Sequence, residues 1–308
     1  MVTTAIQIIV APIIALLVGV FLLGLARKIL ARIHRRYGPP IYQPVIDVIR
    51  MFSQVSISHG ALFELGVVLA LAGSLVTVLF IPLGGSSDAR LFAHDMLYPL
   101  SGSGGLLVVM YLMLLGPVAF ALGAGQSANP NASIGVSRQM LLALAYEVPY
   151  LLVIVTVMSH HGTISVTEIV ARQQAGWWGV VATPLSAAVA FLILPAMLGL
   201  RPFDVASAPQ EISSGPQAEY SGTYLALIEL QGAVHLFVVL ALFVDLFLGG
   251  GMNIVTFLFK MLIVFVVVEM IRAVLPRVKV ESAVKFCWKW PVASGVATGR
   301  RETVFAAT

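Results

Sequence analysis

The chain has very little cysteine and very little charge. Among its 308 residues there is one cysteine, Cys287, and only 10% of the residues are charged. A single thiol excludes a disulfide framework and any iron–sulfur or zinc site built from four cysteines of this chain. No glycine-rich phosphate-binding loop follows a strand pattern, and no metal site is predicted. If the protein takes part in redox chemistry, its cofactors belong to other subunits.

Hydrophobic residues make up 59% of the chain. Charged residues make up only 10%, whereas they make up roughly 25% of soluble domains. Long apolar runs approach the roughly 20 residues that a membrane-spanning helix needs. They cover residues 4–26, 64–83, 105–124, 139–158, 179–200, 223–248 and 252–275. No basic segment precedes the first run and no cleavage site follows it, so it is interpreted as a span and not as a secretory signal. The sequence predicts an all-α integral membrane protein, a single transmembrane domain over 1–308 with about seven helices.

The basic residues predict an orientation. If the N-terminus is outside, fifteen of the eighteen Lys and Arg residues fall on the cytoplasmic side, and only Arg90 and Arg172 fall outside. Such a bias follows the positive-inside rule. We therefore expect a multi-pass protein of the cytoplasmic membrane with an outside N-terminus and a basic cytoplasmic tail over 276–308.

Residues 41–56 predict an amphipathic helix at the membrane surface. Apolar residues recur there at helical spacing, while Asp47 and Arg50 fall on the opposite face. Arg35 and Arg36 precede it. Two interpretations stay open. The helix is either a lipid anchor or, together with these four charged residues, a face on which a partner docks.

The segment 201–222 cannot be a simple spanning helix. It holds Asp204, Glu211 and Glu219 against a single cation, Arg201, and several prolines and glycines interrupt it. Non-helical backbone is tolerated near lipid only where protein or a water-filled cavity surrounds it. The segment is either a polar cytoplasmic loop between two spans or part of a hydrated interior.

Ionisable residues also fall inside the predicted spans. Each costs about 2.5–3.5 kcal/mol on insertion scales, so such residues usually face a bundle interior and mark an ion path. Structural alternatives remain: His235 as a packing residue, Lys260 reaching to the interface, and Glu269 in a surface ion pair with Arg272. Glu147, well inside its span, has the weakest structural explanation. The residues concerned are Glu147, Glu229, His235, Asp245, Lys260 and Glu269.

Three motifs in order resemble the subunit 1 family of respiratory complex I and its relatives in membrane-bound energy-converting hydrogenases. The first is Arg35 to Pro39 before the amphipathic helix, the second joins Ser137 and Arg138 to Tyr146 and Glu147, and the third is the segment 201–222. In the third, Pro202, Phe203 and Asp204 lead through Glu211 to Glu219, Tyr220, Ser221 and Gly222. The eighth helix usual in that family is not evident, because residues 292–308 are short and polar, so its presence stays open.

The resemblance implies a non-catalytic coupling subunit of a redox-driven proton or sodium pump. Its acidic passage would include Glu147, Asp204, Glu211 and Glu219, with Glu229, His235 and Lys260 as further candidates and Arg201 balancing the acids. Expected partners are hydrogenase-like large and small subunits, which would carry a NiFe centre and [4Fe-4S] clusters, and antiporter-like membrane subunits. The residues Ala206, Ser207 and Ala208, where quinone-reducing members carry acids, favour the hydrogenase branch. The alternatives are the quinone-binding subunit of a complex I-type oxidoreductase and a stand-alone ion transporter.

Overall fold

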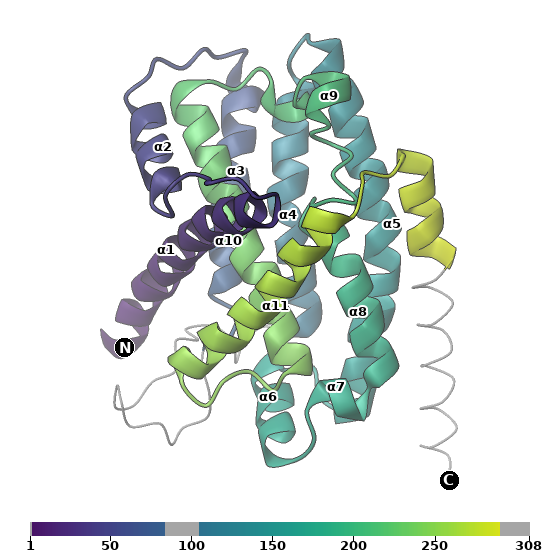
Figure 1. The fold of residues 1–308 in the computed structure, drawn as a ribbon. Coiled ribbons are helices and arrows are strands. Elements are labelled where there is room, and N and C mark those ends of the chain that lie inside the picture. The colour runs from purple at the N-terminus through teal and green to yellow at the C-terminus, as the bar shows by residue number, and fades with distance from the viewer. Residues whose placement is uncertain (1, 84–104, 290–308) are drawn as a thin grey trace.

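A computed structural model describes residues 2–83 and 105–289, which form helices and connecting loops without a β-strand (Figure 1). The elements in order are α1 (Val2–Ile33), α2 (Gln43–Phe52), α3 (Ala61–Val78), α4 (Leu106–Gly125), α5 (Pro130–His161), α6 (Val166–Ala175), α7 (Gly179–Ala182), α8 (Pro184–Met197), α9 (Pro209–Ile212), the 3-10 helix η1 (Gly215–Gln217), α10 (Gly222–Phe247) and α11 (Ile254–Val274). The prediction of an all-α membrane protein is confirmed.

Six of these helices are long and apolar enough to cross a membrane: α1, α3, α4, α5, α10 and α11. The predicted fifth span, 179–200, differs. It divides into the single turn α7 and the 14-residue helix α8. Pro184 stands in the first turn of α8, where its missing N–H needs no partner, so the proline starts a new helix and breaks the run.

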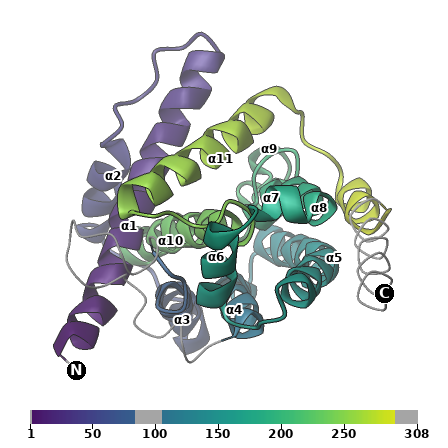
Figure 2. The ribbon, with the colours of Figure 1, turned by 90° about the horizontal axis from the view of Figure 1, so that it is seen from below.

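Helix α10 is the centre of the bundle. Figure 2 shows it between α1 and α11 on one side and α3, α4 and α5 on the other. Every residue from Leu236 to Phe247 is buried. A helix that is apolar on all sides is stable only when neighbours surround it, which explains this central place.

Small residues let α1 approach α10 closely. A Cβ added at Gly19 of α1 would lie 2.2 Å from the carbonyl oxygen of Ala233 in α10. A Cβ added at Gly232, the residue before Ala233, would meet nothing within 4 Å. Contacts of this kind are typical of packed membrane helices. The α1–α10 interface therefore depends on glycine at position 19.

Gly19→Ala is expected to destabilise the protein by about 1–3 kcal/mol, because α1 must move away from α10 to admit the methyl group. Gly232→Ala is the matched control and is expected to be neutral or slightly stabilising. Thermal unfolding of the purified membrane complex measures both. Equal unfolding midpoints for the two variants would show that α1 does not pack on α10 in this way.

The basic tail begins with a helix over residues 280–289. Ala283 and Cys287 are buried in the core, and the rings of Phe286 and Phe203 lie 5.6 Å apart between centroids. The first part of the tail therefore packs against the bundle. Residues 290–308 lie outside the described residues, as does Arg90. Residues 290–308 include most of the predicted tail and the segment in which the presence of an eighth helix stays open.

Candidate functional site: a charged cavity beside the acidic loop

The segment 201–222 is a loop that is anchored in the protein by its apolar residues. Phe203, Val205 and Ile212 are each 5% exposed or less. The chain turns back at residues 213–215, which all have positive φ, and a Cβ at Gly215 would lie 2.3 Å from the carbonyl oxygen of Ala206. Only glycine avoids that clash. The loop is thus held in one path over the end of the bundle, where Figure 1 shows α9.

Two acids of this loop have arginine partners from distant parts of the chain. Asp204 accepts hydrogen bonds from Ser207 and from Arg277, whose Nη2 lies 3.0 Å from Oδ2. Glu211 pairs with Arg138 of α5 at 2.7 Å, and this hydrogen bond lowers the pKa of the Glu211 carboxyl. Arg201, expected to balance these acids, is exposed and takes part in none of the ion pairs within the described residues. The charge balance comes from Arg277 and Arg138.

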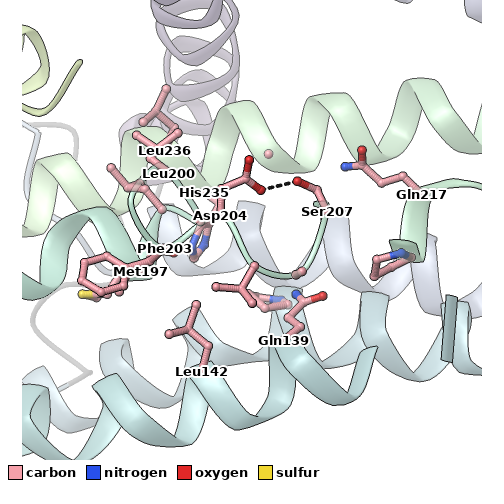
Figure 3. Close-up of a pocket in the computed structure, with 18 of the residues that line it drawn as sticks. Gln139, Leu142, Met197, Leu200, Phe203, Asp204, Ser207, Gln217, His235 and Leu236 are labelled. Carbon is pink, nitrogen blue, oxygen red and sulfur yellow. Dashed lines mark hydrogen bonds between the residues drawn. The ribbon is translucent and has the colours of Figure 1, made fainter. Parts of the chain in front are cut away.

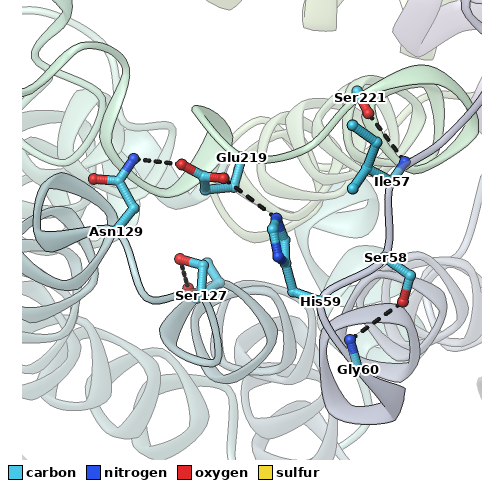
Figure 4. A network of polar contacts seen from close by, with 9 residues as sticks. Ile57, Ser58, His59, Gly60, Ser127, Asn129, Glu219 and Ser221 are labelled. Carbon is cyan, nitrogen blue, oxygen red and sulfur yellow. Dashed lines mark hydrogen bonds and ion pairs between the residues drawn. The ribbon is translucent and has the colours of Figure 1, made fainter.

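Glu219 belongs to a separate polar network (Figure 4). Asn129 Nδ2, just before α5, donates to Glu219 Oε1 at 2.5 Å, and His59 Nε2 lies 3.3 Å from Oε2. The next residue, Tyr220, stacks on Phe63 of α3 with ring centroids 4.0 Å apart. Glu219 therefore ties the loops before α3, α5 and α10 together.

A cavity of about 300 Å³ lies between this loop and helices α1, α4, α5, α8, α10 and α11 (Figure 3). Its walls are mostly apolar, with Leu142, Met197 and Phe203 among them. Its polar and ionisable lining includes Gln139, Asp204, Ser207, Gln217, Glu229, His235, Glu269 and Arg272. Three of the predicted site residues, Asp204, Glu229 and His235, are thus brought together in one space. His235 also makes a hydrogen bond of 3.1 Å to the carbonyl oxygen of Met197, which fixes its ring against α8.

Glu269 corrects one expectation. It forms the expected ion pair with Arg272, at 3.2 Å, but its side chain is 2% exposed and lines the cavity instead of the protein surface. The reason lies in the sequence of α11: Glu269 follows Met261 and Phe265 at intervals of four and so falls on the buried face. That spacing was a signal that could have identified it.

Arg27 of α1 is a site residue that the sequence did not single out. Its Nη1 lies 2.7 Å from Asp47 of α2 and its Nη2 lies 4.0 Å from Glu229. Hydrogen bonds from Gln43 and then from Arg27 lower the pKa of Asp47. The polar face of α2 is therefore turned toward the bundle, and one guanidinium joins this helix to a cavity acid.

The outward face of α2 is apolar, as Val45, Ile49 and Phe52 are 45% exposed or more. It suits a lipid surface or a partner, so both interpretations of the helix remain. Of the predicted docking residues, Arg35, Arg36 and Arg50 are exposed. Asp47 is engaged within the chain by Arg27.

Besides Glu211 and Glu219 of the loop, the predicted path residues Glu147 and Lys260 also lie outside the cavity. Glu147 of α5 is half-buried and directly follows Tyr146, which lines the cavity. Lys260 of α11 caps the far end of α10, with its Nζ 2.7 Å from the carbonyl oxygens of Leu248 and Gly250. Within the described residues no three His, Cys, Asp or Glu side chains gather to hold a metal ion.

Similarity to known proteins agrees with this architecture. The protein is similar to a chain of the membrane-bound sulfane sulfur reductase, an archaeal respiratory membrane complex, with a TM-score of 0.91 and 34% identity over 97% of this chain and 99% of that one. It is 30% identical to hydrogenase-4 component C of Escherichia coli (strain K12), with 82% of each chain covered. It is 29% identical to an NADH-quinone oxidoreductase subunit of Syntrophobacter fumaroxidans, over 90% of this chain and 87% of the relative.

The fold, the cavity and these similarities define a multi-pass membrane subunit of a respiratory oxidoreductase complex that works with partner subunits. Residues 6–298 match the NADH dehydrogenase family, and the chain belongs to this family, that of subunit 1 of complex I. It is a membrane subunit of complex I-like or hydrogenase-like energy-converting complexes.

Proposed function

We propose that this chain is the coupling subunit of an energy-converting hydrogenase-type ion pump. Electron transfer takes place in peripheral partners, hydrogenase-like large and small subunits that together carry a NiFe centre and [4Fe-4S] clusters. A change of charge in those partners shifts the loop 201–222 and with it the surroundings of Asp204. The ionisable groups of the cavity then exchange protons, and the proton or sodium movement is completed in antiporter-like membrane subunits.

The observation that carries this proposal is the cavity itself. Asp204, Glu229, His235 and Glu269 line one space inside an apolar bundle, where isolated charges are costly and usually functional. Moving a neighbouring charge changes the free energy of ionisation of such groups, and each change of about 1.4 kcal/mol shifts a pKa by one unit. In this proposal, loop movement shifts the pKa values of the cavity groups and so makes them take up or release a proton.

The described contacts suggest a direction for this transfer. Arg27 links Glu229 to the surface helix α2, and Arg277 links Asp204 to the segment after α11. Both links reach the side of the bundle that bears the acidic loop. Glu147 follows a cavity-lining residue along α5, beside the exposed Leu144 and Val148, and so faces a neighbouring membrane subunit in this proposal. The cavity is the point of input and Glu147 the point of transfer onward.

Glu147→Gln is expected to leave electron transfer to artificial carriers measurable while abolishing ion translocation, because glutamine keeps the shape but cannot take up a proton. The assay compares both activities in the purified complex after reconstitution into vesicles. Glu168→Gln is the matched control: Glu168 lies in the first turn of α6, accepts a hydrogen bond from Thr163 and does not line the cavity, so both activities should be retained. Undiminished translocation by Glu147→Gln would remove Glu147 from the path.

The same preparation separates the alternatives. Co-migration of the chain with nickel and iron–sulfur proteins in mild detergent supports the hydrogenase type, to which the similarity to hydrogenase-4 component C points. Co-migration with a quinone-reducing activity and without nickel supports the quinone oxidoreductase type, to which the similarity to the Syntrophobacter fumaroxidans protein points. Migration without metal-containing partners would favour a stand-alone transporter.

A further inference from the structure

The end of α10 opposite the cavity carries a second charged site. There the helix unwinds into Leu248, Gly249, Gly250 and Gly251 before α11, beside α6 and α7 at the end of the bundle away from α9 (Figure 1). Gly249 and Gly250 have positive φ, which turns successive carbonyl groups out of the helical direction. The carbonyl oxygens at the end of a helix carry partial negative charge and favour a cation.

Side-chain donors converge on these carbonyl oxygens. Lys260 Nζ lies 2.7 Å from the oxygens of both Leu248 and Gly250, and 4.5 Å from the ring centroid of Trp178. Gln174 of α6 donates to the oxygen of Gly249 at 3.2 Å. The ammonium group of Lys260 is thus held as a free ammonium ion would be, by carbonyl oxygens and an aromatic face.

A fully buried carboxylate adjoins this ammonium site. Asp245 is 1% exposed, and a Cβ at Gly250 would lie 3.1 Å from its Oδ1, so the carboxylate faces the same link. Within the described residues Asp245 Oδ2 and Gln174 Oε1 are buried and have no hydrogen-bond partner. Buried polar atoms are almost always satisfied, so two such acceptors beside one glycine link favour a cationic or protonated group as their partner.

We propose that the link 248–251, together with Asp245 and Gln174, is a binding site for a monovalent cation of about the size of an ammonium ion, such as potassium, and that Lys260 is its tethered and displaceable occupant. Rings of carbonyl oxygens bind such cations by replacing their hydration shell. One carboxylate balances one positive charge, which favours a monovalent over a divalent ion. Lys260 is partly exposed, so an ion has access to the site.

Lys260→Met empties the site while keeping an apolar side chain of similar length. The purified Lys260→Met complex is expected to show an unfolding midpoint that rises saturably with potassium chloride but not with choline chloride at equal ionic strength, by mass action of a bound ligand. The double variant Lys260→Met/Asp245→Asn is expected to lose this response. An equal response to both salts, or none in the single variant, would overturn the proposal.

A second measurement uses the unaltered complex and decides the matter even if Lys260→Met fails to assemble. Acylation of Lys260 by an amine-reactive reagent, followed by mass spectrometry, reports how often its ammonium leaves the carbonyl oxygens. Potassium chloride should raise the labelling saturably relative to choline chloride, while an exposed lysine such as Lys279 should label equally in both salts. Labelling of Lys260 that is indifferent to potassium would contradict displacement by the ion. Neither measurement depends on ion pumping, so the proposed function can fail or succeed separately.

Discussion

Glu229→Gln should reduce ion translocation by roughly 100-fold or to the detection limit, since a positioned proton-transfer group typically contributes that much or more. Glu229 lines the cavity from α10, and Arg27 Nη2 lies 4.0 Å from its carboxylate. Glutamine fills the same volume and can still bond to its neighbours, so the fold should be kept. It cannot exchange a proton, however, and the cavity loses the acid that Arg27 connects to α2. Vesicles containing the purified complex measure translocation and electron transfer to artificial carriers side by side.

Glu281→Gln is the matched control for this variant. Glu281 is exposed on the helix over 280–289 and does not line the cavity, so its replacement removes the same charge without touching the site. We expect normal translocation and normal electron transfer. Loss of translocation in both variants, or in neither, would mean that the charge of Glu229 has no special part in coupling.

Arg277→Met should destabilise the folded chain by about 2–3 kcal/mol, somewhat below the 3–5 kcal/mol of a fully buried broken pair. The side chains of Arg277 and Asp204 are 16% and 20% exposed, and their ion pair joins the segment after α11 to the acidic loop. The backbone N–H of Val278 also donates to the carbonyl oxygen of Pro202 at 3.0 Å. Removing the guanidinium leaves a largely buried carboxylate without its cation, and the loop should loosen. The unfolding midpoint of the purified complex and the yield of assembled partners both report this loss.

Arg201→Met tests whether charge alone explains that effect. Arg201 lies in the same loop as Asp204, is exposed and joins none of the ion pairs of the described residues. Its substitution should therefore be nearly neutral. Adding Asp204→Asn to Arg277→Met should recover part of the stability, because the unpaired charge is then removed. Equal destabilisation by Arg277→Met and Arg201→Met, without such recovery, would contradict the assigned ion pair.

The apolar runs were enough to predict the long helices, because a helix in lipid must satisfy its own backbone hydrogen bonds and its length is set by the bilayer. The amphipathic helix α2 also followed from local spacing. The division of 179–200 did not, although Pro184 marks the break. An apolar run indicates burial or lipid contact but does not show how many helices share it.

The candidate site was predictable only in part. The acids of 201–222 and the ionisable residues in the spans identified its components, but their pairing depends on contacts between residues far apart in sequence. Arg277 is 73 residues from Asp204, and Arg138 is 73 residues from Glu211, so no local pattern distinguishes them from Arg201. The cavity is likewise composite, since α5, α8, α10 and the loop each supply part of it. By contrast, the place of Glu269 on the buried face of α11 was readable from helical spacing.

An infrared difference spectrum of the intact complex, taken between its oxidised and reduced states, measures whether the cavity acids change protonation as the partners change redox state. We expect a carboxyl signal that is present in the unaltered complex and in Glu281→Gln but diminished in Glu229→Gln. Identical redox difference spectra for the unaltered complex and Glu229→Gln would show that Glu229 does not change protonation with the redox state of the partners.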